Sequence, residues 1–197
     1  MIKCLLFDVF GVLVHYDINS YRKYLSATSG KGLRTVNRIV SPLEDKIDAG
    51  LIRAGQFEYL ISKRLVIQRN RVNYPQFFKS SAKPNKPLLR RLMVLRKRYK
   101  LAFLTNAGYM EYKVALKLMG FPYFDCKIVS CYLKLIKPDP RIYKHAIKKL
   151  GLRPSEILFV DDKKKNADAA RQAGMAAILF KNNRGLFGRS GKLSRYN

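Results

Sequence analysis

The sequence is poor in carboxylates, poor in cysteine and without a long apolar run. Only 13 of its 197 residues are Asp or Glu, against 40 Lys and Arg, which gives a formal charge of +27. This excess favours anionic ligands or surfaces. Because the basic residues are spread along the chain rather than gathered in one arm, the charge predicts the sign of a partner but not its identity.

The three cysteines, Cys4, Cys126 and Cys131, cannot all pair with one another, and none has the CxxC spacing of a metal or redox site. This usage is typical of a reducing compartment, so we expect a cytoplasmic protein. The first apolar run contains Asp8 and is too short to cross a bilayer, and therefore we expect no membrane partner.

Five short runs rich in branched and aromatic residues predict β-strands, at 3–7, 101–104, 127–129, 157–160 and 177–180. Between them lie helical patterns, with apolar stripes within 88–95 and 142–150. This alternation of strand and helix is typical of a parallel sheet covered on both faces. We therefore predict the α/β class, with a Rossmann-like, three-layer α/β/α parallel sheet.

The segment 15–87 interrupts that alternation. It contains helical patterns at 20–26, 43–48 and 56–65 and no clear strand, and the paired prolines of 83–87 predict an extended return linker. We interpret it as a small α-helical cap at 15–87, inserted into a core formed by 1–14 and 88–197. The basic tail 181–197 is expected to be mobile, although Leu186 and Phe187 could dock.

Polar residues follow four of the predicted strands. In parallel sheets the carboxyl ends of the strands meet at one crevice, so these residues should converge. They are Asp8, Thr105 with Asn106, Lys137, and Asp161 with Asp162. Carboxylates, a hydroxyl and an ammonium form a set able to attack an anionic electrophile beside a cation.

Four ordered motifs resemble those of the haloacid dehalogenase-like hydrolase superfamily: Phe7-Asp8-Val9-Phe10-Gly11-Val12-Leu13, Leu104-Thr105-Asn106, Lys137-Pro138-Asp139-Pro140 and Phe159-Val160-Asp161-Asp162. The sequence that flanks the last two motifs resembles that of the subgroup with a helical cap after the first strand. Most members of this superfamily are magnesium-dependent phosphatases, and a smaller branch are metal-free dehalogenases. The resemblance covers nearly the whole chain.

The resemblance implies a role for each strand-end residue. Asp8 would be the nucleophile, Thr105 and the backbone amides of Asn106 and Ala107 would bind phosphoryl oxygens, and Lys137 would neutralise charge and restrain Asp8. Mg²⁺ would be held by Asp8, the Phe10 backbone carbonyl, Asp161 and Asp162. The implied activity is hydrolysis of a small phosphorylated metabolite through an aspartyl-phosphate.

Plainer roles exist for the same residues. Thr105 and the Asp161-Asp162 pair could cap the helices that follow them, and Lys137 could be a solvated charge. His15 lies near the crevice and could act as an acid in catalysis, but we expect it to be a residue of the linker to the cap. His145 is expected to be exposed.

Two positions depart from the family pattern. Phosphatases usually have a second aspartate at the position of Phe10, and acid/base assistance of that kind contributes about 10²–10⁴-fold, so activity should be weak on poor leaving groups. Lys134 stands where related sequences have glycine. The aromatic Phe10 keeps a metal-free 2-haloacid dehalogenase open as an alternative; it would need a substrate-holding arginine, for which the candidates are Arg22, Arg34, Arg38 and Arg53.

A second alternative is a catalytically weak protein that uses the same fold to bind a polyanion nonspecifically through its charge. No nucleic-acid-binding motif supports it. The sequence itself predicts no oligomeric state.

Overall fold

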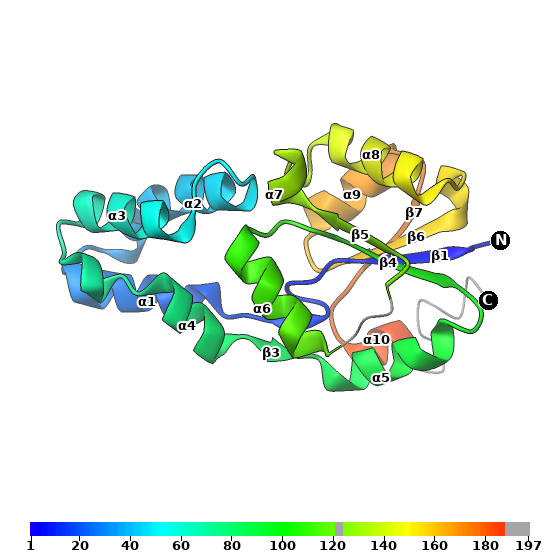
Figure 1. The fold of residues 1–197 in the computed structure, drawn as a ribbon, viewed down its shortest axis with the longest axis horizontal. Helices are drawn as coiled ribbons and strands as arrows, with labels where there is room; N and C mark the ends of the chain where they lie inside the picture. The colour runs from blue at the N-terminus through cyan, green and yellow to red at the C-terminus, as the bar shows by residue number, and fades with distance from the viewer. Residues whose placement is uncertain (121–123, 188–197) are drawn as a thin grey trace.

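A five-stranded parallel sheet forms the centre of the computed structural model, which describes residues 1–120 and 124–187 (Figure 1). The strand order is β5-β4-β1-β6-β7, with β1 at Cys4–Phe7, β4 at Lys100–Thr105, β5 at Cys126–Val129, β6 at Ile157–Asp161 and β7 at Ala176–Leu179. The five predicted strands are therefore confirmed to within one residue at each end. Cys4, in the central strand, lies beside Lys100 on one side and Ile157 on the other.

Helices cover both faces of the sheet because alternate strand residues point to opposite sides. Leu5 and Phe7 belong to the core cluster that includes buried residues of α5 (Lys86–Leu95), α6 (Tyr109–Met119) and α10 (Asn183–Phe187). Cys4 and Leu6 belong to the cluster with α8 (Pro140–Leu150) and α9 (Lys164–Gln172). The predicted α/β class with three layers is confirmed. The short helices α7 (Ser130–Leu133) and η2 (Pro154–Glu156) complete this part.

A helical segment follows β1 and lies to the left of the sheet in Figure 1. It consists of α1 (Ile18–Ser29), α2 (Leu33–Asp48), α3 (Ala54–Leu65), η1 (Arg69–Arg71) and α4 (Tyr74–Ser81). The predicted helices fall inside α1, α2 and α3. However, α2 begins at Leu33 rather than 43 and continues through Pro42, because its buried face, Val36, Val40, Leu43 and Ile47, outweighs the hydrogen bond that proline cannot make. The domain boundaries stay a prediction.

The prediction that 15–87 holds no strand and that 83–87 is an extended linker was wrong in detail. β2 (Val14–His15) and β3 (Lys83–Pro84) form an antiparallel pair where the chain leaves and re-enters the sheet region. Helix α5 already begins at Lys86, with the Asn85 side chain accepting a hydrogen bond from the Leu88 amide. Strands of two residues are too short to show an alternation of apolar and polar residues, so the sequence did not reveal β2 and β3. A proline in the first turn of a helix removes no hydrogen bond, so Pro87 did not mark the start of α5 as extended backbone.

The C-terminal segment docks as far as the structure describes it. Leu186 of α10 is buried, and Asn183 exchanges two hydrogen bonds with Asn85, at 3.1 and 2.8 Å. The expected docking of this dipeptide is thus confirmed for Leu186, while Phe187 is half-buried. The rest of the predicted mobile tail, 188–197, lies outside the described residues.

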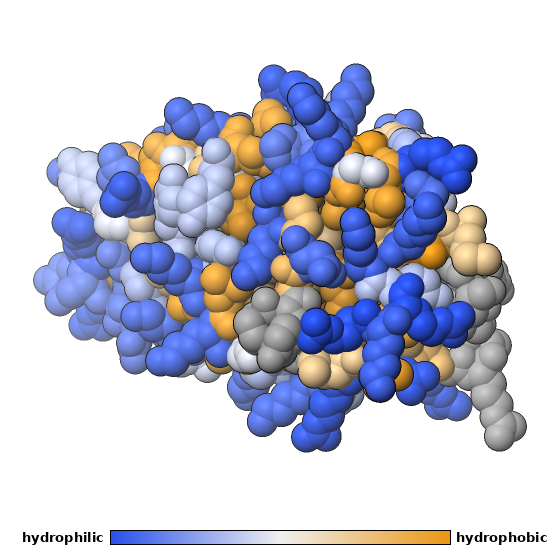
Figure 2. All heavy atoms as spheres, turned by 45° about the vertical axis from the view of Figure 1, so that its right-hand side comes forward, coloured by the Kyte–Doolittle hydropathy of each residue, from blue (hydrophilic) through white to orange (hydrophobic). Residues whose placement is uncertain are grey.

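Hydrophilic residues spread over the whole face shown in Figure 2, with small apolar groups between them. None of the helices in the described ranges combines the length and apolar composition that a membrane crossing needs. All three cysteines are free thiols, with Cys4 and Cys131 buried.

Candidate active site

Asp8 leaves the central strand β1 and is buried in the crevice at its carboxyl end. Its Oδ1 accepts a hydrogen bond from the Val9 amide at 2.6 Å and lies 2.9 Å from the Lys137 ammonium nitrogen. Both contacts use Oδ1, and no described residue donates a hydrogen bond to Oδ2. One carboxylate oxygen is therefore positioned by the protein while the other is available for a ligand.

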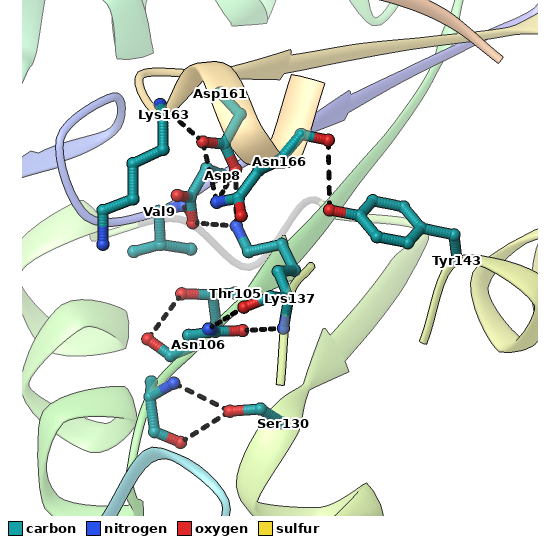
Figure 3. A network of polar contacts seen from close by, with 11 residues as sticks. Asp8, Val9, Thr105, Asn106, Ser130, Lys137, Tyr143, Asp161, Lys163 and Asn166 are labelled. Carbon is teal, nitrogen blue, oxygen red and sulfur yellow. Dashed lines mark hydrogen bonds and ion pairs between the residues drawn. The ribbon is translucent and has the colours of Figure 1, made fainter. Parts of the chain in front are cut away.

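Lys137 lies between two carboxylates, as Figure 3 shows. Besides Asp8, its Nζ lies 2.7 Å from Asp161 Oδ2, and only 2% of the residue is exposed. Burial lowers the pKa of the Lys137 ammonium, but Asp8 and Asp161 outweigh burial and the net shift is upward. Lys137 is thus a permanently charged, buried side chain rather than a solvated lysine. We call Asp8, Lys137 and Asp161 the lysine cluster.

Asp161, at the end of β6, is fully buried and fully partnered. Burial acts to raise its pKa, but Lys137, the Lys163 amide and the Asn166 side chain together lower it. The Asn166 amide donates to both carboxylate oxygens at 3.0 Å, and the Asn166 carbonyl accepts from the Tyr143 hydroxyl at 3.1 Å. Asn166, which was not among the predicted site residues, therefore holds the Asp161 carboxylate in place.

The two carboxylates of the lysine cluster differ in their acidity. Burial raises the pKa of Asp8 to about 7, an effect that Lys137 opposes and Asp161 reinforces. Because Asp161 is ionised and hydrogen-bonded, it takes the larger share of the lysine charge. Asp8 is therefore the more basic of the two, which suits a group that must share electrons with an electrophile.

Asn106, which follows β4, fixes the backbone of Lys137 through two hydrogen bonds. Asn106 Oδ1 accepts from the Lys137 amide at 2.7 Å, and Asn106 Nδ2 donates to the Lys137 carbonyl at 3.0 Å. The Thr105 hydroxyl contacts the Asn106 carbonyl at 3.4 Å and does not cap α6, which begins at Tyr109 after Gly108. The Ala107 amide donates to Ser130 Oγ at 2.9 Å, and its assistance in binding a phosphoryl group stays a prediction.

Asp162 follows Asp161 and is the exposed member of an acidic trio. Asp8, Asp161 and Asp162 each offer a carboxylate oxygen, and these atoms lie within 4.8 Å of one another. Burial, reinforced by Asp161, raises the pKa of Asp162. Gly11 permits this approach: its φ is +93°, and a Cβ there would collide with the Asp162 carboxylate. Three convergent carboxylates form a donor set that suits a hard divalent cation.

Lys134 ends α7 in the left-handed conformation, with φ of 54°. Glycine adopts this conformation without strain, which accounts for its occurrence at this position in related sequences. In this chain Lys137 nevertheless reaches both carboxylates, three residues further on.

A cavity of about 390 Å³ opens beside the lysine cluster. Of the predicted site residues, Asp8, Phe10, Asn106, Lys137 and Asp162 line it, whereas Thr105 and Asp161 do not. The Phe10 ring packs edge-on against Phe78 of α4, with ring centroids 5.5 Å apart. The position of the missing second aspartate is thus part of an apolar wall shared with the helical segment.

Three further carboxylates, which the sequence reasoning missed, line the same cavity: Glu44 and Asp48 of α2 and Glu111 of α6. We call them the acidic cluster. Burial raises the pKa of each, and mutual repulsion adds to the shift of Asp48. The signal that could have revealed Glu111 was an acid in an otherwise acid-poor chain, five residues after the Leu104-Thr105-Asn106 motif.

The two histidines lie outside the cavity lining. His15 is exposed in β2, opposite Lys83, in agreement with a linker role. His145 was expected to be exposed but is half-buried in α8, because it lies next to the buried Ala146 face.

Comparison with known proteins confirms the resemblance. The model of the haloacid dehalogenase-like hydrolase family matches residues 2–174, so the chain belongs to this family. The pig protein bifunctional epoxide hydrolase 2 (Sus scrofa) is 33% identical over 108 residues, which is 52% of this chain but only 20% of that protein's length.

Two solved structures show how widely this fold is shared. A HAD family enzyme from Bacteroides thetaiotaomicron, in complex with magnesium and inorganic phosphate, has a TM-score of 0.77 at 23% identity, covering 95% of this chain and 100% of its own. L-2-haloacid dehalogenase from Xanthobacter autotrophicus has a TM-score of 0.63 at 20% identity, covering 100% and 87%. At these identities the similarity concerns the fold.

Proposed function

We propose that this hydrolase is a Mg²⁺-dependent phosphatase that acts on a small phosphorylated metabolite, with Asp8 as the nucleophile. The observation that carries the proposal is the burial of Lys137 between Asp8 and Asp161 at the wall of a cavity. A fixed cation beside a carboxylate with a free oxygen is an arrangement that attracts a phosphoryl group and holds it near the attacking atom. The bacterial neighbour with magnesium and phosphate supports the same substrate class.

The reaction we infer proceeds in two displacements at phosphorus. An Asp8 oxygen forms a bond to phosphorus while the bond to the leaving oxygen breaks, which gives an aspartyl-phosphate. Water then attacks this phosphorus, releases phosphate and restores the Asp8 carboxylate. Lys137 neutralises charge on the phosphoryl oxygens in both steps, and Asn106 positions Lys137 from behind. A direct contact of Thr105 and the Asn106 amide with the phosphoryl group stays a prediction.

The acidic trio fits a magnesium ion. Asp8, Asp161 and Asp162 would hold it through oxygen, together with the Phe10 backbone carbonyl, and it would supply neutralisation of phosphoryl charge. The fit is best at Asp8 and Asp162, since hydrogen bonds to Lys137, Lys163 and Asn166 already use both oxygens of Asp161.

The leaving oxygen needs a proton that Phe10 cannot supply. We therefore expect faster turnover of substrates whose leaving group is already a weak base, such as acyl phosphates or aryl phosphates. Alkyl phosphates should be slow by about 10²-fold or more relative to a site with a proton donor at this position.

The alternative is a metal-free dehalogenase, which Phe10 and the similarity to the Xanthobacter fold favour. A halide leaves without a proton, so an aromatic residue at position 10 would be no handicap. Two observations weigh against it. Asp162 would repel a carboxylate substrate, and of the candidate arginines only Arg22 lines this cavity, where it is already paired with Glu44.

One panel of assays tests the proposal. Acyl phosphates, aryl and alkyl phosphates and 2-haloacids are each incubated with Mg²⁺ or with EDTA, using wild type, Asp8→Asn and the exposed control Asp45→Asn. We expect Mg²⁺-dependent phosphate release that Asp8→Asn removes and Asp45→Asn retains. Phosphate release that survives Asp8→Asn would contradict the mechanism, and halide release in EDTA would establish the dehalogenase instead.

A further inference from the structure

The cavity beside Asp8 collects almost all the unpartnered polar atoms of the described residues. Seven buried side-chain nitrogen or oxygen atoms in the described part of the chain have no hydrogen-bond partner. Six of these belong to residues that line this one cavity: Tyr16 Oη, Arg22 Nε, Glu44 Oε1, both oxygens of Glu111, and Asn166 Oδ1. Because buried polar groups are nearly always satisfied, this concentration indicates a missing ligand.

The unpartnered atoms define what the ligand must offer. The two oxygens of Glu111, one of Glu44 and one of Asn166 can only accept hydrogen bonds when the carboxylates are ionised; the Tyr16 hydroxyl can accept or donate, and only Arg22 Nε must donate. A ligand that satisfies this set therefore presents several donors on one group. Glu111 is the strongest case, because only 3% of it is exposed and the neighbouring Tyr74 hydroxyl does not reach hydrogen-bond geometry with either of its oxygens.

The ligand group must also carry positive charge. Glu44 is paired with Arg22, but no ion pair within the described residues reaches Asp48 or Glu111. Lys163 also lines the cavity and lowers the pKa of Asp48, but it is exposed and lies directly after Asp162. Five of the 13 acidic residues of this basic chain line this single cavity. A water molecule would supply donors yet leave the carboxylate charge uncompensated, whereas an ammonium group supplies both.

We propose that the phosphorylated substrate carries a protonated amine on its leaving group, and that Asp48 and Glu111 bind this amine while the lysine cluster binds the phosphoryl group. The substrate class is thus a small amino-alcohol phosphate, which is an alkyl phosphate; its turnover should be slow, because no side chain at position 10 protonates the leaving oxygen. This inference rests on the proposed phosphatase function, since the phosphoryl group is what places the amine in the cavity. The neighbouring Tyr16 and Tyr74 hydroxyls, which line the same cavity, would complete the polar surroundings of the amine.

Three phosphonates of nearly equal size test the proposal, because their carbon–phosphorus bond is not hydrolysed as an ester is. They are 2-aminoethylphosphonate, 2-hydroxyethylphosphonate and propylphosphonate, with a cation, a neutral donor and a methyl group at corresponding positions. Calorimetric titration of wild type with Mg²⁺ present should show the amine binding about tenfold tighter or more than either other ligand, as one charge-assisted contact implies. The variants Glu111→Gln and Asp48→Asn should remove that preference and leave propylphosphonate binding unchanged.

Asp45→Asn is the matched control. Asp45 belongs to the same helix, α2, and lies between Glu44 and Asp48 in the sequence, but it is exposed and does not line the cavity. The Asp45→Asn variant should retain the amine preference. Thermal unfolding of each variant verifies that it is folded. If Glu111→Gln does not fold, the titration of Asp48→Asn tests the amine site independently.

The outcomes separate this inference from the proposed function. Equal binding of all three phosphonates, or equal binding of the amine and the hydroxyl ligand, overturns the amine site and leaves the phosphatase standing. A loss of affinity in Glu111→Gln that is the same for all three ligands also overturns it, since Glu111 would then be structural. If no phosphonate binds and no phosphate ester is turned over, both proposals fall together.

Discussion

The lysine cluster is buried, and in the acidic cluster Glu111 is buried while Glu44 and Asp48 are half-buried. Both clusters line or adjoin the same cavity, yet their carboxylates are partnered in opposite ways. Around Lys137, the cation contacts both carboxylates within 2.9 Å, and Asp161 has further donors on both oxygens. Around Glu111, neither oxygen has a donor at hydrogen-bond geometry within the described residues, although the Tyr74 hydroxyl lies nearby and lowers the pKa of this carboxyl. In the lysine cluster the carboxylates already have a positive charge and hydrogen-bond donors beside them. In the acidic cluster, one oxygen of Glu44 and both of Glu111 lack hydrogen-bond donors among the described residues, and Asp48 and Glu111 lack an ion-pair partner there. Under the proposed function, the first cluster would carry the chemistry and the second would recognise the substrate.

Removing the shared cation should have the largest effect on this contrast. Lys137→Met leaves Asp8 and Asp161 side by side without a counter-charge, and we expect the free energy of unfolding to fall by about 3–5 kcal/mol near neutral pH. Without Lys137, both carboxyl groups would have higher pKa values in the folded than in the unfolded protein. The free energy of unfolding of the variant therefore falls as pH rises through the range between these pKa values, and its deficit relative to wild type shrinks towards pH 4.

Urea unfolding of wild type and Lys137→Met at pH 5 and pH 8 measures this deficit, with the exposed Lys165→Met as control. A deficit of the same size at both pH values would show that lost packing, not unpaired charge, is responsible.

Supplying the lysine cluster with the proton donor that it lacks should have the next largest effect. Phe10→Asp places a carboxyl two residues after the nucleophile, and we expect turnover of alkyl phosphates to rise by about 10²-fold, while acyl phosphates change little. The ratio of the two rates is the measurement, since it cancels the stability lost when the Phe10–Phe78 ring contact is removed. A fall of both rates in proportion would show that Phe10 acts through packing alone.

The acidic cluster should behave in the opposite sense to the lysine cluster. Burial raises the pKa of Glu111 above its usual value, so ionisation of this residue opposes folding. Glu111→Gln should therefore stabilise the ligand-free protein by roughly 1–2 kcal/mol at pH 8 and by nearly nothing at pH 4, because the cost appears only as pH rises through and above the window between the unfolded and folded pKa. Thermal unfolding at several pH values follows this change, and a destabilised variant at pH 8 would contradict the absence of a partner.

A backbone change beside both clusters should have the smallest effect. Lys134→Gly relieves the left-handed conformation at the end of α7, and we expect a gain of about 1 kcal/mol with unchanged turnover. Denaturant unfolding gives the first quantity and steady-state assays the second. An altered turnover would mean that this turn controls the position of Lys137.

The five sheet strands were predictable because each is a short run rich in apolar residues, and a polar group follows four of them along the chain. Asp8, Lys137 and Asp161 converge because parallel strands deliver their carboxyl ends to one edge. The β2–β3 pair and the start of α2 were not predictable, since two residues give no alternation and Pro42 masks a helix that tertiary packing stabilises.

The acidic cluster was missed for a different reason. Glu44, Asp48 and Glu111 lie on helical faces and belong to no motif, so only the docking of α2 near the start of α6 brings them together. Their significance depends on which oxygens lack a partner, and this is a property of packing that no local pattern encodes.

The pairing of β1 has a consequence for how the protein is made. The strand that leads to Asp8 leaves the ribosome well before its neighbours in the sheet, which begin at Lys100 and Ile157. During synthesis this apolar segment therefore waits without a partner while the helices that follow it can already form, because helical contacts are local and strand contacts here are not. The central strand, with Asp8 at its end, is therefore paired on both sides only once β6 has been made, and of the sheet strands only the edge strand β7 follows.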